Sequence, residues 1–420
     1  MPRNPRRALL SEVLQCSLLA AGIWGFPQTV SSQALANNSK AGAEPDWPVA
    51  NPVTAKAWIL VDLTTGQSLA GQEDGRHIEP GGLTSMMTAY LTLAALRDRQ
   101  LRAQQVVPGP DPASVPAGPK MFLPQSGATV KELLVGVFLI GALDAAIALA
   151  NAIAGGEEQF VALMNETARR LGMESTRFVN ATGAPGALGT GSTGGNTRPV
   201  TTARDLALLG LRTYQEFPDV LQITTQREFV ANGIRQTNRN RLLWLDRSVD
   251  GFLATDQSLA SSCLVTARRP QPLGPKEQIQ RRIMLVLLES KNIESRAQET
   301  LELLNFGFQQ FDLVRLFRQD ALPAAIEVFK GVRPKVKTEF RQDVMVAAPR
   351  RQIPLLRAEM ETAQGLVAPV TAGQAVGALR ISLGNLAIHR VDLVAAESIE
   401  SAGLLGRAID SLRLIVRTLP

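Results

Sequence analysis

Residue types and spacings that could support catalysis are few in this 420-residue chain. A serine becomes a nucleophile when a general base lies beside it, such as a lysine one helical turn away or a histidine oriented by an aspartate. The chain contains nine lysines, and none has a serine three residues before it. Its two histidines, His77 and His389, are predicted to be surface histidines or to have satisfied hydrogen bonds. No nucleophile–base pair is evident from these spacings.

Other polar residues give weaker hypotheses of catalysis. Ser85 has a hydroxyl but no basic partner, so it is predicted to be a helix-surface or capping residue. Asp144 and Asp256 could in principle act as an acid and a base. The stretch Ser290-Lys291-Asn292 is predicted to lie in a loop before a helix, away from any cleft.

Metal, cofactor and nucleic-acid chemistry are not predicted. Two cysteines and two histidines are too few for a Cys/His zinc cluster, so we expect no metal and no cofactor. Residues 183–195 are rich in glycine but lack the Gly-Lys-Ser/Thr ending of a phosphate loop, and are predicted to form a mobile surface loop. The net charge of +6 is not concentrated in a basic run with interleaved aromatic residues, which argues against nucleic-acid binding.

The N-terminus resembles an export signal. Arg3, Arg6 and Arg7 precede an apolar stretch over residues 14–26, and Ala34-Leu35-Ala36 offers a small-residue cleavage site. The alternative is a retained membrane anchor, but the apolar stretch is shorter than the ~20 residues that span a bilayer. We therefore predict a signal peptide over residues 1–36, followed by a flexible leader over residues 37–52.

The elements that follow indicate an α/β (α+β) domain over residues 53–318. A β-rich run at residues 55–62 and a turn at residues 64–66 predict a hairpin. Apolar residues at helical spacing predict a helix over residues 84–96, one or two helices over 131–153, and another that starts near Thr202. Strands are predicted over residues 262–267 and 282–288. The hydrophobic content of 45% is typical of a globular protein.

Two smaller parts complete the predicted architecture. Short alternating runs separated by Pro and Gly predict a small β-sandwich domain over residues 319–400. Residues 401–420 have the period of an amphipathic helix whose polar face carries Arg407, Arg413 and Arg417 against Asp410. This face suits an anionic membrane surface, and the alternative is a helix docked on its own protein.

Several stretches of the chain, in the same order, resemble exported D-alanyl-D-alanine carboxypeptidases, the low-molecular-mass penicillin-binding proteins. The resemblance covers nearly all of residues 53–420. It implies a penicillin-recognising, β-lactamase-like domain, a small β-domain and a terminal amphipathic helix. The stretches that carry it are Ala55-Lys-Ala-Trp-Ile-Leu-Val-Asp62, Asn180-Ala-Thr-Gly183, Thr202-Ala-Arg-Asp205, Asn238-Arg-Asn-Arg-Leu-Leu-Trp244 and Val249-Asp-Gly251.

The three active-site motifs of that family are degenerate in this chain. The family pattern is a Ser-x-x-Lys pair that supplies nucleophile and base, a Ser-x-Asn loop, and a Lys-Thr-Gly strand that pairs with the substrate carboxylate. Where the resemblance places these motifs, the residues that stand there are Gly82 and Ser85 in the first, Gly141 and Leu143 in the second, and Leu253, Ala254 and Thr255 in the third. The resemblance also places Asp144 beside the second motif, in a supporting role.

The loss of all three motifs predicts a catalytically inactive homologue with a binding or scaffolding role in peptidoglycan metabolism. Without the lysine and threonine of the third motif, a terminal carboxylate would be buried unpaired, so affinity for D-Ala-D-Ala ends is not expected. The alternative is an active carboxypeptidase that uses non-standard residues. Natural loss and deliberate alteration of the motifs would leave the same sequence.

The expected location is the periplasm, with the chain peripherally attached to the inner membrane. The inner-membrane surface, contacted through the C-terminal helix, is the first expected partner. Peptidoglycan or cell-wall enzymes are the others.

Overall fold

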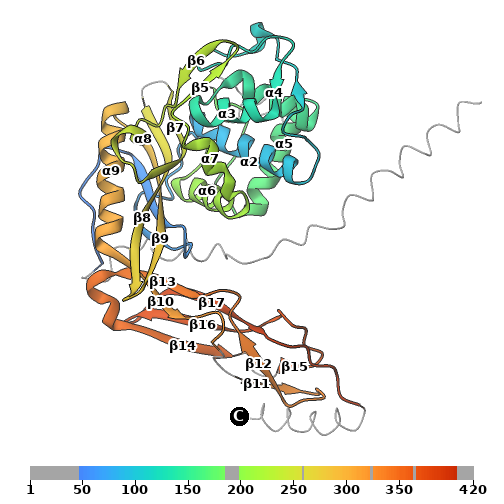
Figure 1. Cartoon of the computed structure of the whole chain (residues 1–420), viewed down its shortest axis with the longest axis vertical. Helices are drawn as coiled ribbons and strands as arrows, with labels where there is room; N and C mark the ends of the chain where they lie inside the picture. Colours follow the sequence, from blue (N-terminus) through green and yellow to red (C-terminus); the bar gives the residue numbers. More distant parts are fainter. Residues whose placement is uncertain (1–46, 185–197, 258–259, 322–324, 363–365, 404–420) are drawn as a thin grey trace, which may run out of the picture.

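The computed structural model describes residues 47–184, 198–257, 260–321, 325–362 and 366–403 (Figure 1). The predicted signal peptide, most of the predicted leader, the glycine-rich residues 185–195 and residues 404–420 of the predicted C-terminal helix lie outside these ranges. Within the described residues, no helix is both long and apolar enough to cross a membrane.

The first domain is built on an antiparallel five-stranded sheet of order β2-β1-β9-β8-β7. The sheet confirms the predicted hairpin at its start and the two predicted strands, which are longer than expected. Its strands are β1 (Ala57–Asp62), β2 (Ser68–Gln72), β7 (Val249–Gln257), β8 (Ala260–Gly274) and β9 (Glu277–Ser290).

Helices cover both faces of this sheet (Figure 1). The predicted helix that starts near Thr202 is confirmed, and the Thr202 side chain accepts a hydrogen bond from the backbone N–H of Asp205. The region 131–153 forms two helices, because the first ends at Gly141. The helices are α2 (Ser85–Arg97), α3 (Val130–Ile140), α4 (Leu143–Ala154), α5 (Glu157–Leu171), α6 (Ala203–Glu216), α7 (Leu221–Thr224), α8 (Leu242–Leu245) and α9 (Ile293–Gln310), with the short 3-10 helix η2 (Gly81–Thr84) before α2.

Alternation along β1 explains why the sheet is covered on both sides. Successive side chains of a strand point to opposite faces. Ile59 and Val61 belong to the core shared with α2–α6, whereas Trp58 and Leu60 belong to the core shared with α9. A strand that is apolar from its first residue to Val61, as this one is, therefore sits between two layers of helices.

Two short antiparallel strand pairs complete the first domain. One is formed by β3 (Val106–Val107) and β4 (Ala128–Thr129), and the other by β5 (Glu228–Ala231) and β6 (Ile234–Thr237).

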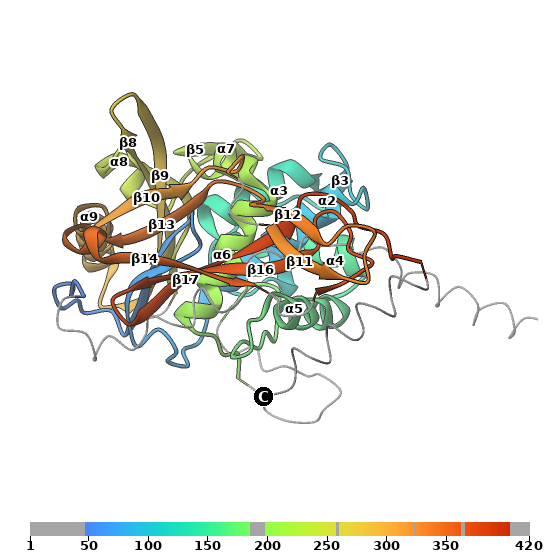
Figure 2. The same cartoon turned by 90° about the horizontal axis from the view of Figure 1, so that it is seen from below.

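The second domain is a β-sandwich, as predicted (Figure 2). A six-stranded sheet has the order β14-β16-β17-β12-β11-β15, and β10 pairs with β13 in a separate ladder. The predicted boundary at residue 318 remains a prediction, but β10 lies before it and pairs with β13 beyond it. The strands are β10 (Phe311–Phe317), β11 (Ala325–Phe329), β12 (Lys335–Glu339), β13 (Val344–Pro349), β14 (Leu356–Thr362), β15 (Leu366–Val367), β16 (Ala375–Leu383) and β17 (Leu386–Ala395).

Gln67, in the turn between β1 and β2, joins the two domains. Its side-chain amide donates hydrogen bonds to the carbonyl oxygens of Ala347 (3.3 Å) and Ile388 (3.1 Å), and it accepts one from the N–H of Ala347 (2.8 Å). Trp47 donates from Nε1 to the carbonyl of Leu69 and packs on Phe311. These two contacts place the indole of Trp47 at the junction of the domains.

His389, on β17, differs from its prediction as a surface or satisfied histidine. It is half-buried, and its buried Nδ1 has no hydrogen-bond partner. Burial lowers the pKa of His389 from 6.5 to about 4, although the charge of Asp62 opposes the shift.

We expect this histidine to make stability fall in acid. Above pH 6.5 the imidazole is neutral in both states; between about pH 6.5 and 4 the unfolded chain binds the proton and the folded chain does not. Unfolding free energy should therefore fall by up to about 3 kcal/mol over that window. Urea denaturation across the window should show a smaller fall for His389→Gln. The variant His77→Gln, which replaces an exposed histidine, should keep the wild-type slope, and equal slopes in all three proteins would contradict the prediction.

Candidate functional site

The first degenerate motif lies at the start of α2, the central helix of the first domain. Gly82 and Ser85 are both buried, and Ser85 is 0% exposed. The prediction that Ser85 lies on a helix surface is wrong, because α2 contacts helices on several sides. The alternative of a capping residue agrees with the structure in part: Thr84 is the N-cap of α2, but Ser85 is the C-cap of η2. The Ser85 hydroxyl has no hydrogen-bond partner. A serine without a base to take its proton is a weak nucleophile.

The second degenerate motif joins α3 to α4. Gly141 ends α3 with a φ of 66°, a left-handed conformation that glycine adopts without strain. Leu143 is buried in a small apolar cluster with Val115 and Ala184. The position at which the family pattern has an amide is thus filled by a packed hydrocarbon side chain.

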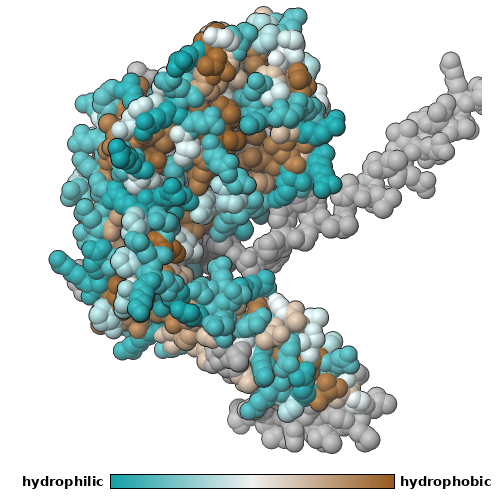
Figure 3. Space-filling view, in the orientation of Figure 1, coloured by the Kyte–Doolittle hydropathy of each residue, from teal (hydrophilic) through white to brown (hydrophobic). Residues whose placement is uncertain are grey.

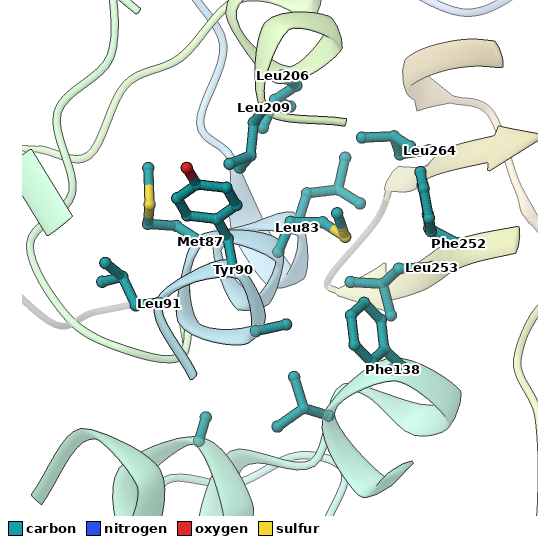
Figure 4. Packing of buried hydrophobic residues seen from close by; sticks show 14 of the residues in the cluster. Leu83, Met87, Tyr90, Leu91, Phe138, Leu206, Leu209, Phe252, Leu253 and Leu264 are labelled. Atoms are coloured by element: carbon teal, nitrogen blue, oxygen red, sulfur yellow. The ribbon is translucent and has the colours of Figure 1, made fainter. Parts of the chain in front are cut away.

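The third degenerate motif lies in β7, and its side chains alternate between the two cores. Leu253 is 0% exposed and packs in the helical core with Phe138 of α3 (Figure 4). Ala254 points to the opposite face, in the core that includes α9. Thr255 is buried, and its carbonyl accepts a hydrogen bond from Nη1 of Arg296 at 3.0 Å. None of these three side chains can pair with a carboxylate as a lysine would.

The fold brings the three motifs into one region. Strand β7 contacts both η2 and α3, and α2 contacts α4. The segment 180–184 links the first two motifs: a Cβ on Gly183 would lie 1.7 Å from the carbonyl oxygen of Gly81, and Ala184 packs on Leu143. Sequence reasoning did not assign this packing to Gly183 and Ala184, although the Asn180-Ala-Thr-Gly183 stretch was the available signal.

The two carboxylates considered as acid and base are occupied by structural contacts. Asp144 accepts hydrogen bonds from the backbone N–H groups of Met121 (2.9 Å), Leu123 (3.1 Å) and Ala145 (2.9 Å). It therefore fixes the segment before α3, in agreement with the supporting role expected for it. Asp256 forms an ion pair with Arg296 and accepts a hydrogen bond from a serine at 2.8 Å.

Arg239 is a charged residue of this region that was not predicted from the sequence as a site residue. It lies within the Asn238-to-Trp244 stretch. Burial lowers the pKa of its guanidinium, while the charge of Asp256 acts in the opposite direction. The nearby Arg296 also donates to the Arg239 carbonyl at 3.3 Å. The basic groups at this end of β7 are thus arginines, which remain protonated and cannot serve as general bases.

The remaining candidates lie elsewhere. His77 is exposed. Ser290 ends β9 and donates from Oγ to Glu299, and Asn292 caps α9 through a hydrogen bond from the N–H of Ser295. Within the described ranges, no cluster of His, Cys, Asp and Glu could hold a metal ion.

The apolar filling of this region gives a test by substitution. We expect Leu253→Lys, which restores the lysine type of the third motif, to destabilise the fold by about 3 kcal/mol or more, because it buries an ammonium group among hydrocarbon side chains. The matched control Leu253→Met preserves volume and should cost less than about 1.5 kcal/mol. Denaturant titration of both variants measures the difference. Equal stability of the lysine variant and the native chain would show that the position opens to water.

Models of one protein family match most of this chain. A family model of D-alanyl-D-alanine carboxypeptidases matches residues 42–286, and a model of the C-terminal domain of penicillin-binding protein 5 matches residues 311–401. The D-alanyl-D-alanine carboxypeptidase DacC of Escherichia coli is 33% identical over 369 residues, which cover 85% of this chain and 87% of DacC. DacA of the same organism is 29% identical over 86% of this chain and 88% of its own.

Solved structures agree with the sequence relatives. The crystal structure of penicillin-binding protein 5 from Haemophilus influenzae has a TM-score of 0.71 and 25% identity, covering 84% of this chain and 100% of that protein. Penicillin-binding protein 6B from Escherichia coli has a TM-score of 0.61 and 25% identity, covering 84% and 98%. The chain therefore belongs to the D-alanyl-D-alanine carboxypeptidase family of peptidoglycan metabolism and has the penicillin-binding protein fold with a C-terminal β-sandwich domain.

Proposed function

We propose that this chain is a catalytically inactive member of its family that acts by binding or scaffolding in peptidoglycan metabolism. The observation that carries the proposal is the set of side chains found at the three degenerate motifs. Ser85 is buried without a hydrogen-bond partner, and Leu143 and Leu253 are packed into apolar clusters. Acyl transfer at a D-Ala-D-Ala bond needs an activated nucleophile and a clamp for the terminal carboxylate, and neither is formed by these side chains.

The same packing argues against retained binding of D-Ala-D-Ala ends. A carboxylate placed beside Leu253 and Ala254 would lose its water and gain no charged partner from them, which costs several kcal/mol. Under this proposal the chain binds its partner through other surfaces. The proposed partners are peptidoglycan itself or cell-wall enzymes.

The proposed location is the periplasmic face of the inner membrane. Its support is the export-like pattern of residues 1–36 and the arginines on the predicted helix of residues 401–420. In this proposal the C-terminal segment lies in the membrane interface and does not cross the bilayer.

Intact-mass measurement after incubation with ampicillin tests the proposed inactivity. Ampicillin acylates a nucleophile of this family, so the mass of the chain should stay unchanged while that of Escherichia coli DacC, treated in parallel, increases by one adduct. A stoichiometric adduct on this chain would overturn the proposal, and its absence from a Ser85→Ala variant would identify the nucleophile.

A further inference from the structure

The described chain ends at the tip of the β-domain, beside the turn that joins β11 to β12. The N–H of Val332 donates to the carbonyl of Glu400 at 3.0 Å, and the N–H of Ala402 donates to the carbonyl of Lys330 at 2.7 Å. These bonds fix residues 400–402 against the turn. The residues that follow Gly403 therefore start from this tip, at the end of the molecule far from the first domain (Figure 1).

Apolar side chains are exposed at the same tip. Val332 is 59% exposed in the β11–β12 turn, and Val367 of β15 is 42% exposed. The two lie in segments that are adjacent in the fold, because Phe329, at the end of β11 and three residues before Val332, pairs with Val367. Pro334 and Pro369 are exposed beside them. Hydrophobic surface is visible at this lower end of the molecule (Figure 3).

The charges around the tip nearly cancel. The turn carries Lys330 and Arg333, β12 begins with Lys335, and the neighbouring segment carries Glu397 and Glu400, so these three cations stand against two carboxylates. Arg333 is paired with Glu397 at 2.8 Å. A surface that is apolar and almost neutral gains little from electrostatic attraction, so any contact that it makes depends on burial of the valines.

We propose that this tip, formed by residues 330–334 and 366–369, is a second membrane contact that inserts Val332 and Val367 into the interface of an anionic lipid bilayer. The inference rests on the proposed attachment through residues 404–420. The arginines of that segment supply the attraction to anionic lipid. Because the segment leaves the domain beside Val332, attachment of the segment brings the tip to the same surface.

Site-specific fluorescence tests the contact. Val332→Cys and the matched control Val106→Cys, whose parent residues are 59% and 58% exposed, are labelled with an environment-sensitive dye on the exported chain with residues 404–420 intact. Cys263 is buried and should remain unlabelled. Vesicles of phosphatidylethanolamine and phosphatidylglycerol should shift the emission to the blue at position 332 and leave position 106, in the first domain, unchanged.

Sedimentation of the same samples with vesicles separates the two proposals. Absence of sedimentation would overturn both the attachment and the tip contact. Sedimentation without a blue shift at position 332, or with equal shifts at both positions, would overturn the tip contact alone. In unlabelled protein, Val332→Asp should weaken vesicle binding about tenfold, which is the contribution to affinity expected from burying one valine side chain in the membrane. Val106→Asp should leave vesicle binding unchanged.

Discussion

D-alanine release from a peptidoglycan pentapeptide is expected to be at least ~10⁴-fold slower with this chain than with Escherichia coli DacC. The reason is that removal of a single member of a cooperating catalytic set lowers the rate by a factor of about that size. Where the resemblance places the nucleophile, its base, the second-motif residues and the carboxylate clamp, other residue types stand. The structure adds that these positions are filled, since Leu253 is packed beside Phe138 and Leu143 beside Val115. Free D-alanine, measured over time with purified protein and pentapeptide, provides the rate.

The control for this measurement is Ser85→Ala. The Gly82–Ser85 motif contains two hydroxyl groups, those of Thr84 and Ser85, and neither has a hydrogen-bond partner. Any trace activity that comes from a contaminating enzyme should be the same in the native chain and in the variant. Release that is rapid with the native chain and lost with Ser85→Ala would show a working nucleophile and contradict the proposed inactivity.

Asp62→Ala is expected to reduce the unfolding free energy by about 3–5 kcal/mol, because it leaves a buried guanidinium without its counter-ion. Asp62 and Arg281 are 0% and 1% exposed and lie 2.7 Å apart. The other Asp62 oxygen accepts the N–H groups of Thr64 (2.9 Å) and Thr65 (3.2 Å), so the same carboxylate also fixes the β1–β2 turn. That turn carries Gln67, the residue that joins the domains.

Glu361→Ala is the matched control for this charge deletion. Glu361 pairs with Arg380 at 3.8 Å and with Arg390 at 3.5 Å, and all three side chains are exposed. Exposed pairs of this kind contribute little, so the change should stay within about 0.5 kcal/mol. If urea denaturation gave equal losses of unfolding free energy in the two variants, the buried Asp62–Arg281 pair would contribute no more to stability than an exposed pair.

Local patterns were enough to predict several elements of the first domain. The hairpin at β1 and β2, the helix at α2 and the cap at Thr202 follow from alternation, helical period and N-cap chemistry, which are properties of neighbouring residues. The supporting role of Asp144 also agrees with the structure, where it binds three backbone N–H groups. Predictions about exposure were less successful, because exposure depends on what packs against an element.

The sequence by itself determined which groups are available for chemistry: none of the nine lysines has a serine three residues before it, and folding cannot supply a missing amine. Only the tertiary structure decided where the remaining groups lie. Ser85 is buried because α2 is surrounded by other helices, and Val332 stands where the described chain ends because residues 400–402 pair with the β11–β12 turn. The burial of Ser85 and the position of Val332 both depend on contacts between segments far apart in the chain. The periodicity of a single segment contains no information about such contacts.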